Sequence, residues 1–130
     1  MNYEFRVAEH AGDHRKCKAL AEAEGVPVKR MYFPTIMALE DGELAGFVAT
    51  DLSQDMVVAG PLVIKSDKRR PRLALKLAEQ YENAMRNLNV KTFIMAVEPD
   101  SVMDKAIQRY TPDMPKYAEK DGWNFYLRRL

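Results

Sequence analysis

The stretch that decides the fold runs from Gly60 to Leu88 and reads GPLVIKSDKRRPRLALKLAEQYENAMRNL. Its first residues continue an almost wholly apolar run that begins at Met56, which is typical of a buried strand. A basic loop follows, in which Asp67 alone opposes the cations Lys65, Lys68, Arg69, Arg70 and Arg72. Pro71 suits the first position of a helix, and the apolar residues after it recur at helical spacing. The stretch therefore predicts a strand, a basic loop and an amphipathic helix.

The start of that helix has an electrostatic consequence. Unpaired N–H groups and the positive end of the helix dipole meet there, so additional cations are disfavoured unless an anion offsets them. The plainer interpretation of such a loop is a solvated basic surface. The position of this loop at a helix start weighs against that interpretation. The junction between residues 64 and 74 therefore predicts a site for a phosphate-bearing ligand.

The rest of the chain supplies further strands and helices. Alternation and turn signals predict strands at Tyr3–Ala8, Thr35–Leu39, Glu43–Thr50, Lys91–Glu98 and Trp123–Leu130. Helices are expected at about His14–Glu24, capped by Asp13, and at about Pro99–Arg109, with Met103, Ala106, Ile107 and Tyr110 on the inner face. Gly60-Pro61 interrupts the long strand and predicts a bulge or a parting of strands. This order predicts an α/β fold, with a mixed, mostly antiparallel sheet of six to seven strands and helices on both faces.

Composition narrows the class of protein. The 130 residues fit one domain, 1–130, and the net charge of +1 makes the basic character local. Cys17 is the single cysteine, so no internal disulfide can form. No run approaches the roughly 20 apolar residues of a membrane helix, and the N-terminus lacks the apolar core of a signal peptide. A cytoplasmic protein is expected. His10 and His14 lack a third ligand, so no metal is expected.

At this point the sequence resembles the GNAT N-acetyltransferases in the order of its elements across nearly the whole chain. The family's pyrophosphate loop reads Arg/Gln-x-x-Gly-x-Gly/Ala, and residues 69–74, RRPRLA, agree with it at Arg69 and Ala74. Arg72 stands where the family has glycine, and Pro71 removes one N–H group. The small size also resembles that of GNAT-like proteins encoded by phages.

Two later motifs add to the resemblance. Ala106 and Tyr110 match an alanine and a tyrosine that lie four apart in the family, although Met103 replaces its frequent asparagine. Gly122-Trp123 loosely resembles the Gly-Phe that precedes the family's last strand.

The resemblance implies acetyl-CoA as cosubstrate, bound between two parted parallel strands. The backbone of Leu62, Val63 and Ile64 would meet the pantetheine arm. The pyrophosphate would lie on the loop and helix start, formed by Arg69, Arg70, Arg72, Leu73 and Ala74. Lys65 or Lys68 would reach the coenzyme's additional phosphate.

The resemblance also implies direct attack of an amine on the thioester. Tyr110 would protonate the leaving thiolate as general acid. Glu98, at the end of its strand, is the first candidate for general base. Asp51 and Asp55 near the sheet edge are alternatives, and a base working through water is equally open.

Two functions therefore compete. The first is an N-acetyltransferase that acetylates an amine of a small molecule or protein. The second is a GNAT-fold protein that has lost catalysis, as Arg72 and Met103 would suggest, and binds a partner protein through its basic loop. Nucleic acid is the less favoured partner because no base-reading motif is present. Relatives often dimerise, and the apolar C-terminal strand is a candidate for pairing across an edge.

Overall fold

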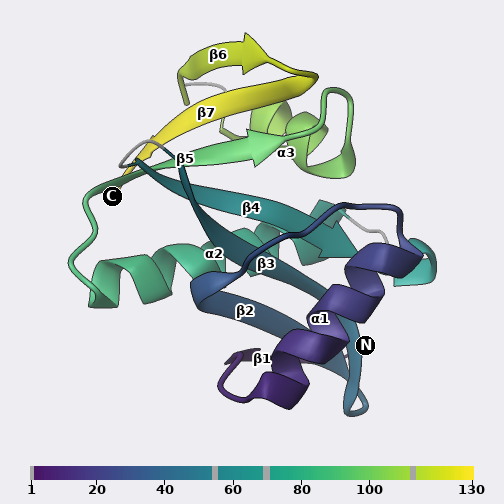
Figure 1. The fold of residues 1–130 in the computed structure, drawn as a ribbon. Helices are drawn as coiled ribbons and strands as arrows, with labels where there is room; N and C mark the ends of the chain where they lie inside the picture. Colours follow the sequence, from purple (N-terminus) through teal and green to yellow (C-terminus); the bar gives the residue numbers. More distant parts are fainter. Residues whose placement is uncertain (1, 54–55, 69–70, 112–113) are drawn as a thin grey trace.

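The computed structural model describes residues 2–53, 56–68, 71–111 and 114–130, which form one seven-stranded mixed sheet flanked by helices (Figure 1). In chain order the elements are β1 (Tyr3–Val7), α1 (Ala11–Ala23), β2 (Tyr32–Glu40), β3 (Glu43–Ser53), β4 (Met56–Ile64), the 3-10 turn η1 (Ser66–Lys68), α2 (Pro71–Asn87), β5 (Thr92–Val97), α3 (Val102–Tyr110), β6 (Lys116–Lys120) and β7 (Trp123–Arg129). The strand order is β1-β2-β3-β4-β5-β7-β6, and β4 with β5 is its parallel pair. The predicted α/β class and mixed, mostly antiparallel sheet are confirmed.

The β2–β3 hairpin turns on the Asp-Gly pair that the sequence indicated. Asp41 and Gly42 both have positive φ, 52° and 81°, as a type I′ turn requires. β1 pairs antiparallel with β2, from Tyr3 opposite Glu40 to Val7 opposite Ile36. β1 to β4 therefore form a continuous antiparallel half of the sheet.

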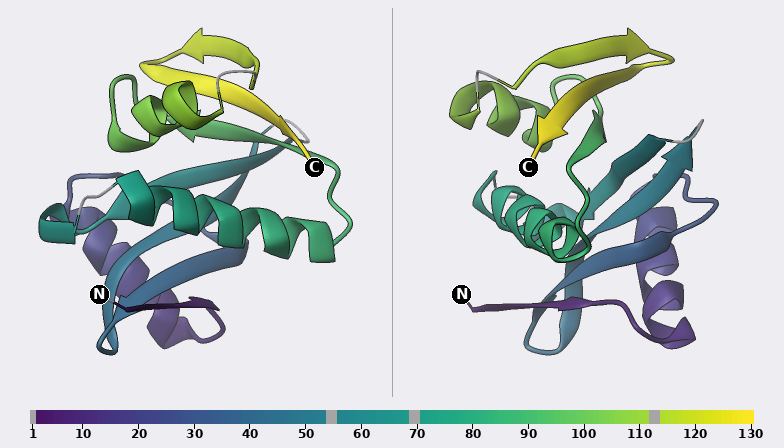
Figure 2. Two further views of the ribbon diagram at one scale, coloured as in Figure 1. Left: turned by 180° about the vertical axis from the view of Figure 1, so that it is seen from behind. Right: turned by 90° about the vertical axis from the view of Figure 1, so that its left-hand side faces the viewer.

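Helices cover both faces of the sheet, as expected (Figures 1 and 2). Alternation along β2 divides its side chains between them. Met37 packs in the core beneath α1, with Cys17 and Ala21. Ile36 packs in the core beneath α2 and α3. Both faces of β2 are thus buried, which accounts for its long apolar run.

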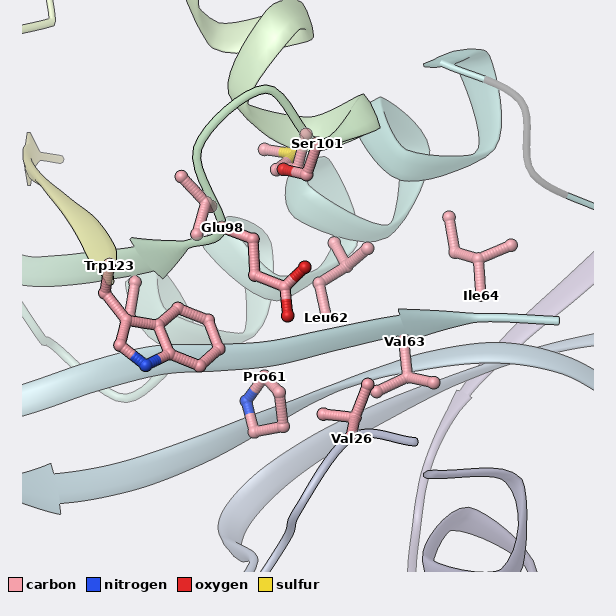
Figure 3. A pocket seen from close by; sticks show the side chains of 11 residues that line it. Val26, Pro61, Leu62, Val63, Ile64, Glu98, Ser101 and Trp123 are labelled. Atoms are coloured by element: carbon pink, nitrogen blue, oxygen red, sulfur yellow. The ribbon is translucent and has the colours of Figure 1, made fainter. Parts of the chain in front are cut away.

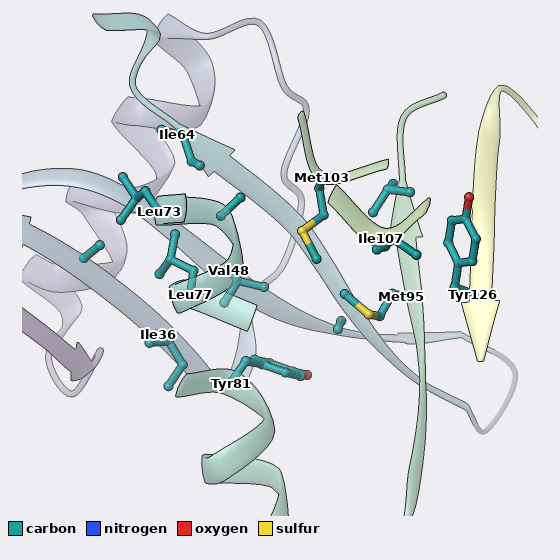
Figure 4. Close-up of a cluster of buried hydrophobic side chains, with 14 of the residues drawn as sticks. Ile36, Val48, Ile64, Leu73, Leu77, Tyr81, Met95, Met103, Ile107 and Tyr126 are labelled. Carbon is teal, nitrogen blue, oxygen red and sulfur yellow. The ribbon is translucent and has the colours of Figure 1, made fainter. Parts of the chain in front are cut away.

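The larger core lies under α2 and α3 (Figure 4). Leu73, Leu77 and Tyr81 of α2 are almost fully buried. The ring of Tyr81 meets Phe93 of β5 edge to face, with 5.3 Å between centroids. Its hydroxyl lies 2.7 Å from Thr50 Oγ1, so the one polar atom of this ring has a partner inside the core. This packing joins β5 and α3 to the antiparallel half.

The first helix begins earlier than the sequence suggested. α1 starts at Ala11, not His14, and Asp13 lies inside its first turn instead of capping it. The carboxylate of Asp13 accepts two hydrogen bonds of 2.8 Å from Arg6 and one of 3.0 Å from the Glu9 N–H. These bonds hold the pKa of Asp13 well below its usual value. The expected cap is wrong because the side chain has a cationic partner on β1.

The closing strand also differs from expectation. β7 lies inside the sheet between β5 and β6, so it cannot pair across an edge with a second copy as predicted. Its buried side chains are Asn124 and Tyr126, while Trp123 is half-buried. In the described part of the chain, no helix is long and apolar enough to cross a membrane.

Candidate functional site

The parallel strands β4 and β5 separate part-way along their length. Their ladder pairs Val58 with Ile94 and Ala59 with Met95, and it extends no further among the described residues. At the separation Gly60 has a φ of 143°, and a Cβ there would lie 3.2 Å from the Ala96 carbonyl oxygen. Only glycine suits this backbone and this close approach.

The bulge predicted at Gly60-Pro61 is confirmed by the register with β3. Thr50 pairs with Ala59 and Val48 with Leu62, so β4 uses one residue more than β3 over the same length. An extra residue bends the strand. The bend turns the end of β4 away from β5 and opens the sheet at this point.

A cavity of about 200 Å³ lies where the two strands separate (Figure 3). Its walls come from β4, β5, the loop after α1, the start of α3 and the start of β7. The lining is mostly apolar, with Glu98 and Ser101 as polar groups, and comprises Val26, Pro61, Leu62, Val63, Ile64, Ala96, Val97, Glu98, Ser101, Met103 and Trp123. The structure thus brings together Leu62, Val63, Ile64 and Glu98, four residues that the sequence analysis had proposed.

Glu98 is the one carboxylate of this lining. It directly follows β5, and its carboxylate points into the space between Trp123 and Leu62 (Figure 3). Ser101 begins α3 as its N-cap, since its Oγ accepts a hydrogen bond of 3.1 Å from the Asp104 N–H. Glu98 is exposed, so an acidic group stands at the solvent side of a mostly apolar space.

The predicted phosphate junction lies between the end of β4 and the start of α2. Leu73 and Ala74 lie in the first turn of α2 with buried side chains, so a bound anion would meet their backbone N–H groups and not their side chains. Arg72 is exposed and does not line the cavity. Arg69 and Arg70 lie outside the described residues, and so does the alternative base Asp55.

Lys68 was expected to be able to reach a phosphate, and the structure gives it another partner. Its Nζ lies 2.9 Å from Glu40 Oε1 at the end of β2. Lys65, the alternative, is exposed. The other candidate base, Asp51, is exposed, and its Oδ1 accepts a 2.8 Å hydrogen bond from the Leu52 N–H.

Tyr110 does not join Glu98 at the cavity. It ends α3, is 54% exposed, and carries the Arg109 guanidinium 5.4 Å from its ring centroid. Its expected place on the inner face of the helix is wrong, whereas Met103, Ala106 and Ile107 are buried there. Its role as general acid stays a prediction.

A polar network that the sequence did not indicate surrounds Asp104, the neighbour of the cavity residue Met103. Asp104 of α3 is 1% exposed, and its carboxylate accepts hydrogen bonds from Tyr126 Oη at 2.6 Å and Asn124 Nδ2 at 3.2 Å. The Asp100 N–H and Gln108 Nε2 donate to its other oxygen. Burial opposes ionisation, but these hydrogen bonds outweigh it and hold the pKa of Asp104 below its usual value. The network fixes α3 against β7.

Trp123 and Val26 were also missed as cavity residues. Trp123 stands at the start of the closing strand, directly after the Gly122 turn, and this position was the available signal. Val26 comes from a loop without periodicity, which gave no signal. In the described part of the chain, no three His, Cys, Asp or Glu side chains gather in a way that could hold a metal ion.

Comparisons with known proteins by sequence find nothing. No family model matches the chain, and no curated protein matches it either.

Solved structures of similar fold do match. The PaiA N-acetyltransferase of Thermoplasma acidophilum, solved with coenzyme A, matches with a TM-score of 0.73 at 11% identity over 100% of both chains. An N-acetyltransferase of Staphylococcus aureus Mu50 matches with a TM-score of 0.75 at 12% identity over 99% of both chains. N-acetylglutamate synthase of Neisseria gonorrhoeae, solved with coenzyme A and N-acetyl-glutamate, matches with a TM-score of 0.66 at 14% identity over 100% of this chain and 35% of its own.

The parted strands, the strand order and these matches define the class of fold. The chain has the GNAT acyl-CoA N-acyltransferase fold, as its sequence motifs had suggested. At these identities the likeness shows the fold.

Proposed function

We propose that the protein is an N-acetyltransferase that moves an acetyl group from acetyl-CoA to an amine of a small molecule or protein. The observation that carries this proposal is the cavity between β4 and β5, in a fold whose neighbours include two proteins solved with coenzyme A. The cavity lies where the resemblance expects the pantetheine arm.

The residues at this position suit such a ligand. The wall of Leu62, Val63 and Ile64 is apolar and belongs to a strand that has left its partner β5. Gly60 supports the fit, because a side chain there would crowd Ala96 at the point where the strands part. The start of α2 offers backbone N–H groups to a pyrophosphate.

Acetyl-CoA, when bound, supplies an activated acetyl thioester. Glu98 removes a proton from the acceptor's ammonium group, since an amine attacks only in its neutral form. The indole of Trp123 and the apolar wall limit the access of water to the same space. Lys65 and Arg72, both exposed beside the helix start, attract the coenzyme's phosphates.

Thermal unfolding with and without acetyl-CoA tests the proposal. A ligand at about 100 times its Kd stabilises the folded state by about 2.7 kcal/mol, which raises Tm by several degrees in a domain of this size. Arg72→Glu should weaken the shift. The charge-matched control is Lys18→Glu, which lies on the exposed side of α1 and should leave the shift intact. An unchanged Tm of the wild type at millimolar acetyl-CoA would overturn the proposal.

A coenzyme-binding protein without transfer is the second candidate. It is favoured by the position of Tyr110, which lies outside the cavity lining. The two candidates differ in the release of free thiol from acetyl-CoA with a panel of primary amines. Coenzyme binding without thiol release for any amine, together with salt-dependent capture of a protein partner, would support the second.

A further inference from the structure

The turn η1 is held from two sides by carboxylates that come from distant parts of the chain. It connects the end of β4 with the residues before α2, and therefore precedes the proposed phosphate site. One carboxylate belongs to Glu40, at the end of β2, and the other to Glu24, at the C-cap of α1. The end of α1 and η1 lie side by side in Figures 1 and 2.

The contact from β2 is a partly buried ion pair. Glu40 and Lys68 are 17% and 24% exposed in their side chains, with 2.9 Å between Oε1 and Nζ. The hydrogen bond to Lys68 lowers the pKa of Glu40, and the same bond raises the pKa of Lys68. Both groups are therefore charged throughout the physiological pH range. Partial burial also makes salt screen this pair less than a surface pair.

The contact from α1 involves two donors of one residue. Ser66 Oγ lies 2.5 Å from Glu24 Oε1, and the Ser66 N–H donates to Glu24 Oε2 at 3.4 Å. The residue just before the turn is also held, because the Lys65 N–H donates to the Ala45 carbonyl of β3 at 2.8 Å. The first and last residues of η1 are thus each bound to a separate element of the fold.

We propose that Glu40 and Glu24 are positioning residues of the coenzyme-phosphate loop. They hold Ser66 and Lys68 of η1, the turn that leads to the start of α2, where backbone N–H groups would meet the pyrophosphate. This inference rests on the proposed function. A turn that is already held in place loses less conformational entropy when a ligand binds beside it, so the two carboxylates favour binding without touching the ligand.

The proposal assigns Lys68 a role different from direct phosphate contact. If Lys68 bound the phosphate, neutralising Glu40 would release its ammonium group and strengthen binding. If Glu40 positions the loop through Lys68, neutralising Glu40 weakens binding despite the gain in positive charge. The direction of the Glu40→Gln effect therefore separates the two roles.

Calorimetric titration with coenzyme A and with 3′-dephospho-coenzyme A measures this direction. Glu40→Gln, Lys68→Met and the double variant should each raise the Kd by about five- to tenfold, and the double variant no more than either single one. The loss should be the same for both coenzymes. Lys68→Arg, which keeps the charge and can reach Glu40, should restore binding. Glu24→Gln should weaken binding independently, so that its effect adds to that of Glu40→Gln.

Glu43→Gln is the matched control, since this exposed glutamate lies in the same hairpin, and its Kd should equal that of the wild type. Tighter or unchanged binding by Glu40→Gln would overturn the proposal. A Lys68→Met loss that disappears with dephospho-coenzyme A would also overturn it, in favour of direct contact.

Amide exchange of residues 65–74 in the free protein separates this inference from the proposed function. Glu40→Gln and Glu24→Gln should speed exchange there without lowering Tm by more than one or two degrees. If the wild-type protein bound no coenzyme, both the proposed function and the coenzyme role of the loop would be overturned. Unchanged exchange in both variants, with wild type still binding coenzyme, would overturn the positioning role alone.

Discussion

At the scale of single residues, the proposed chemistry depends most on Glu98. It is the one carboxylate among the cavity-lining residues, and it points toward the space beside Trp123. Glu98→Gln keeps the shape and removes the basic group. Thiol release should fall by about 10²- to 10⁴-fold, while the Kd for coenzyme A stays the same. Glu79→Gln on the exposed side of α2 is the control and should keep full activity.

Tyr110 is the residue for which resemblance and geometry diverge most. The motif predicts a general acid, but its ring is exposed and stacked under Arg109. If it protonates the thiolate, Tyr110→Phe should lower kcat about 100-fold without changing coenzyme affinity. The alkaline limb of the pH dependence of kcat should also change in this variant. Equal rates for Tyr110→Phe and wild type would remove Tyr110 from the mechanism.

Asp104 should make the free energy of unfolding fall at acid pH. Its pKa is lower in the folded than in the unfolded chain, so its hydrogen bonds contribute fully above about pH 4 and are lost as the pH falls through the folded-state pKa. Asp104→Asn should reduce the free energy of unfolding at pH 7 by about 2 kcal/mol. Urea unfolding between pH 3 and 7 checks this. The free energy of unfolding of the variant should fall less steeply toward acid pH than that of the wild type. An equally steep fall would mean that other carboxylates dominate.

The sequence could predict residues whose role follows from their position along the chain. Glu98 ends a strand and Leu62–Ile64 ends another, so their meeting at one edge follows from strand order. Asp104 and Lys68 could not be interpreted in this way. Their partners, Tyr126 and Glu40, are 22 and 28 residues away, and a polar residue in a helix or loop gives no sign of such a contact.

At the scale of elements, the bulge in β4 decides whether the sheet opens. Gly60→Ala would place a Cβ 3.2 Å from the Ala96 carbonyl oxygen, on a backbone with φ of 143°. We expect a loss of about 1–3 kcal/mol in the free energy of unfolding and weaker coenzyme binding. Gly12→Ala in α1 is the matched control, because its Cβ would meet an Arg15 side-chain atom at an ordinary 3.7 Å and should leave stability the same or higher. Equal stability of both variants would show that β4 can shift without cost.

The elements themselves were largely predictable because local signals agreed. The Asp41-Gly42 turn fixed the hairpin, and Gly60-Pro61 marked the bulge. The start of α1 was placed wrongly because Asp13 is a good capping residue whose carboxylate is used by Arg6 instead. The insertion of β7 between β5 and β6 was also missed, since a terminal strand carries no local signal of its neighbours.

At the scale of the whole molecule, the sheet consists of two halves joined across a short seam. β1 to β4 are antiparallel on one side, and β5, β7 and β6 are antiparallel on the other. The parallel ladder between β4 and β5 contains only the pairs at Val58 and Ala59 among the described residues. Beyond these two pairs, the halves are held together by side chains of α2 and α3 in the larger core.

A ligand that lies in the cavity touches both halves, and amide exchange should report this. With saturating coenzyme A, we expect slower exchange at residues 62–64 of β4 and at residues 96–101 after the parting of β5, because the bound arm restricts the opening of the seam. Residues 3–7 of β1, at the far edge of the sheet, should exchange as in the free protein. Protection confined to the basic loop at residues 65–74 would contradict the proposed position of the arm. It would show that the phosphates bind while the cavity between the two halves stays empty.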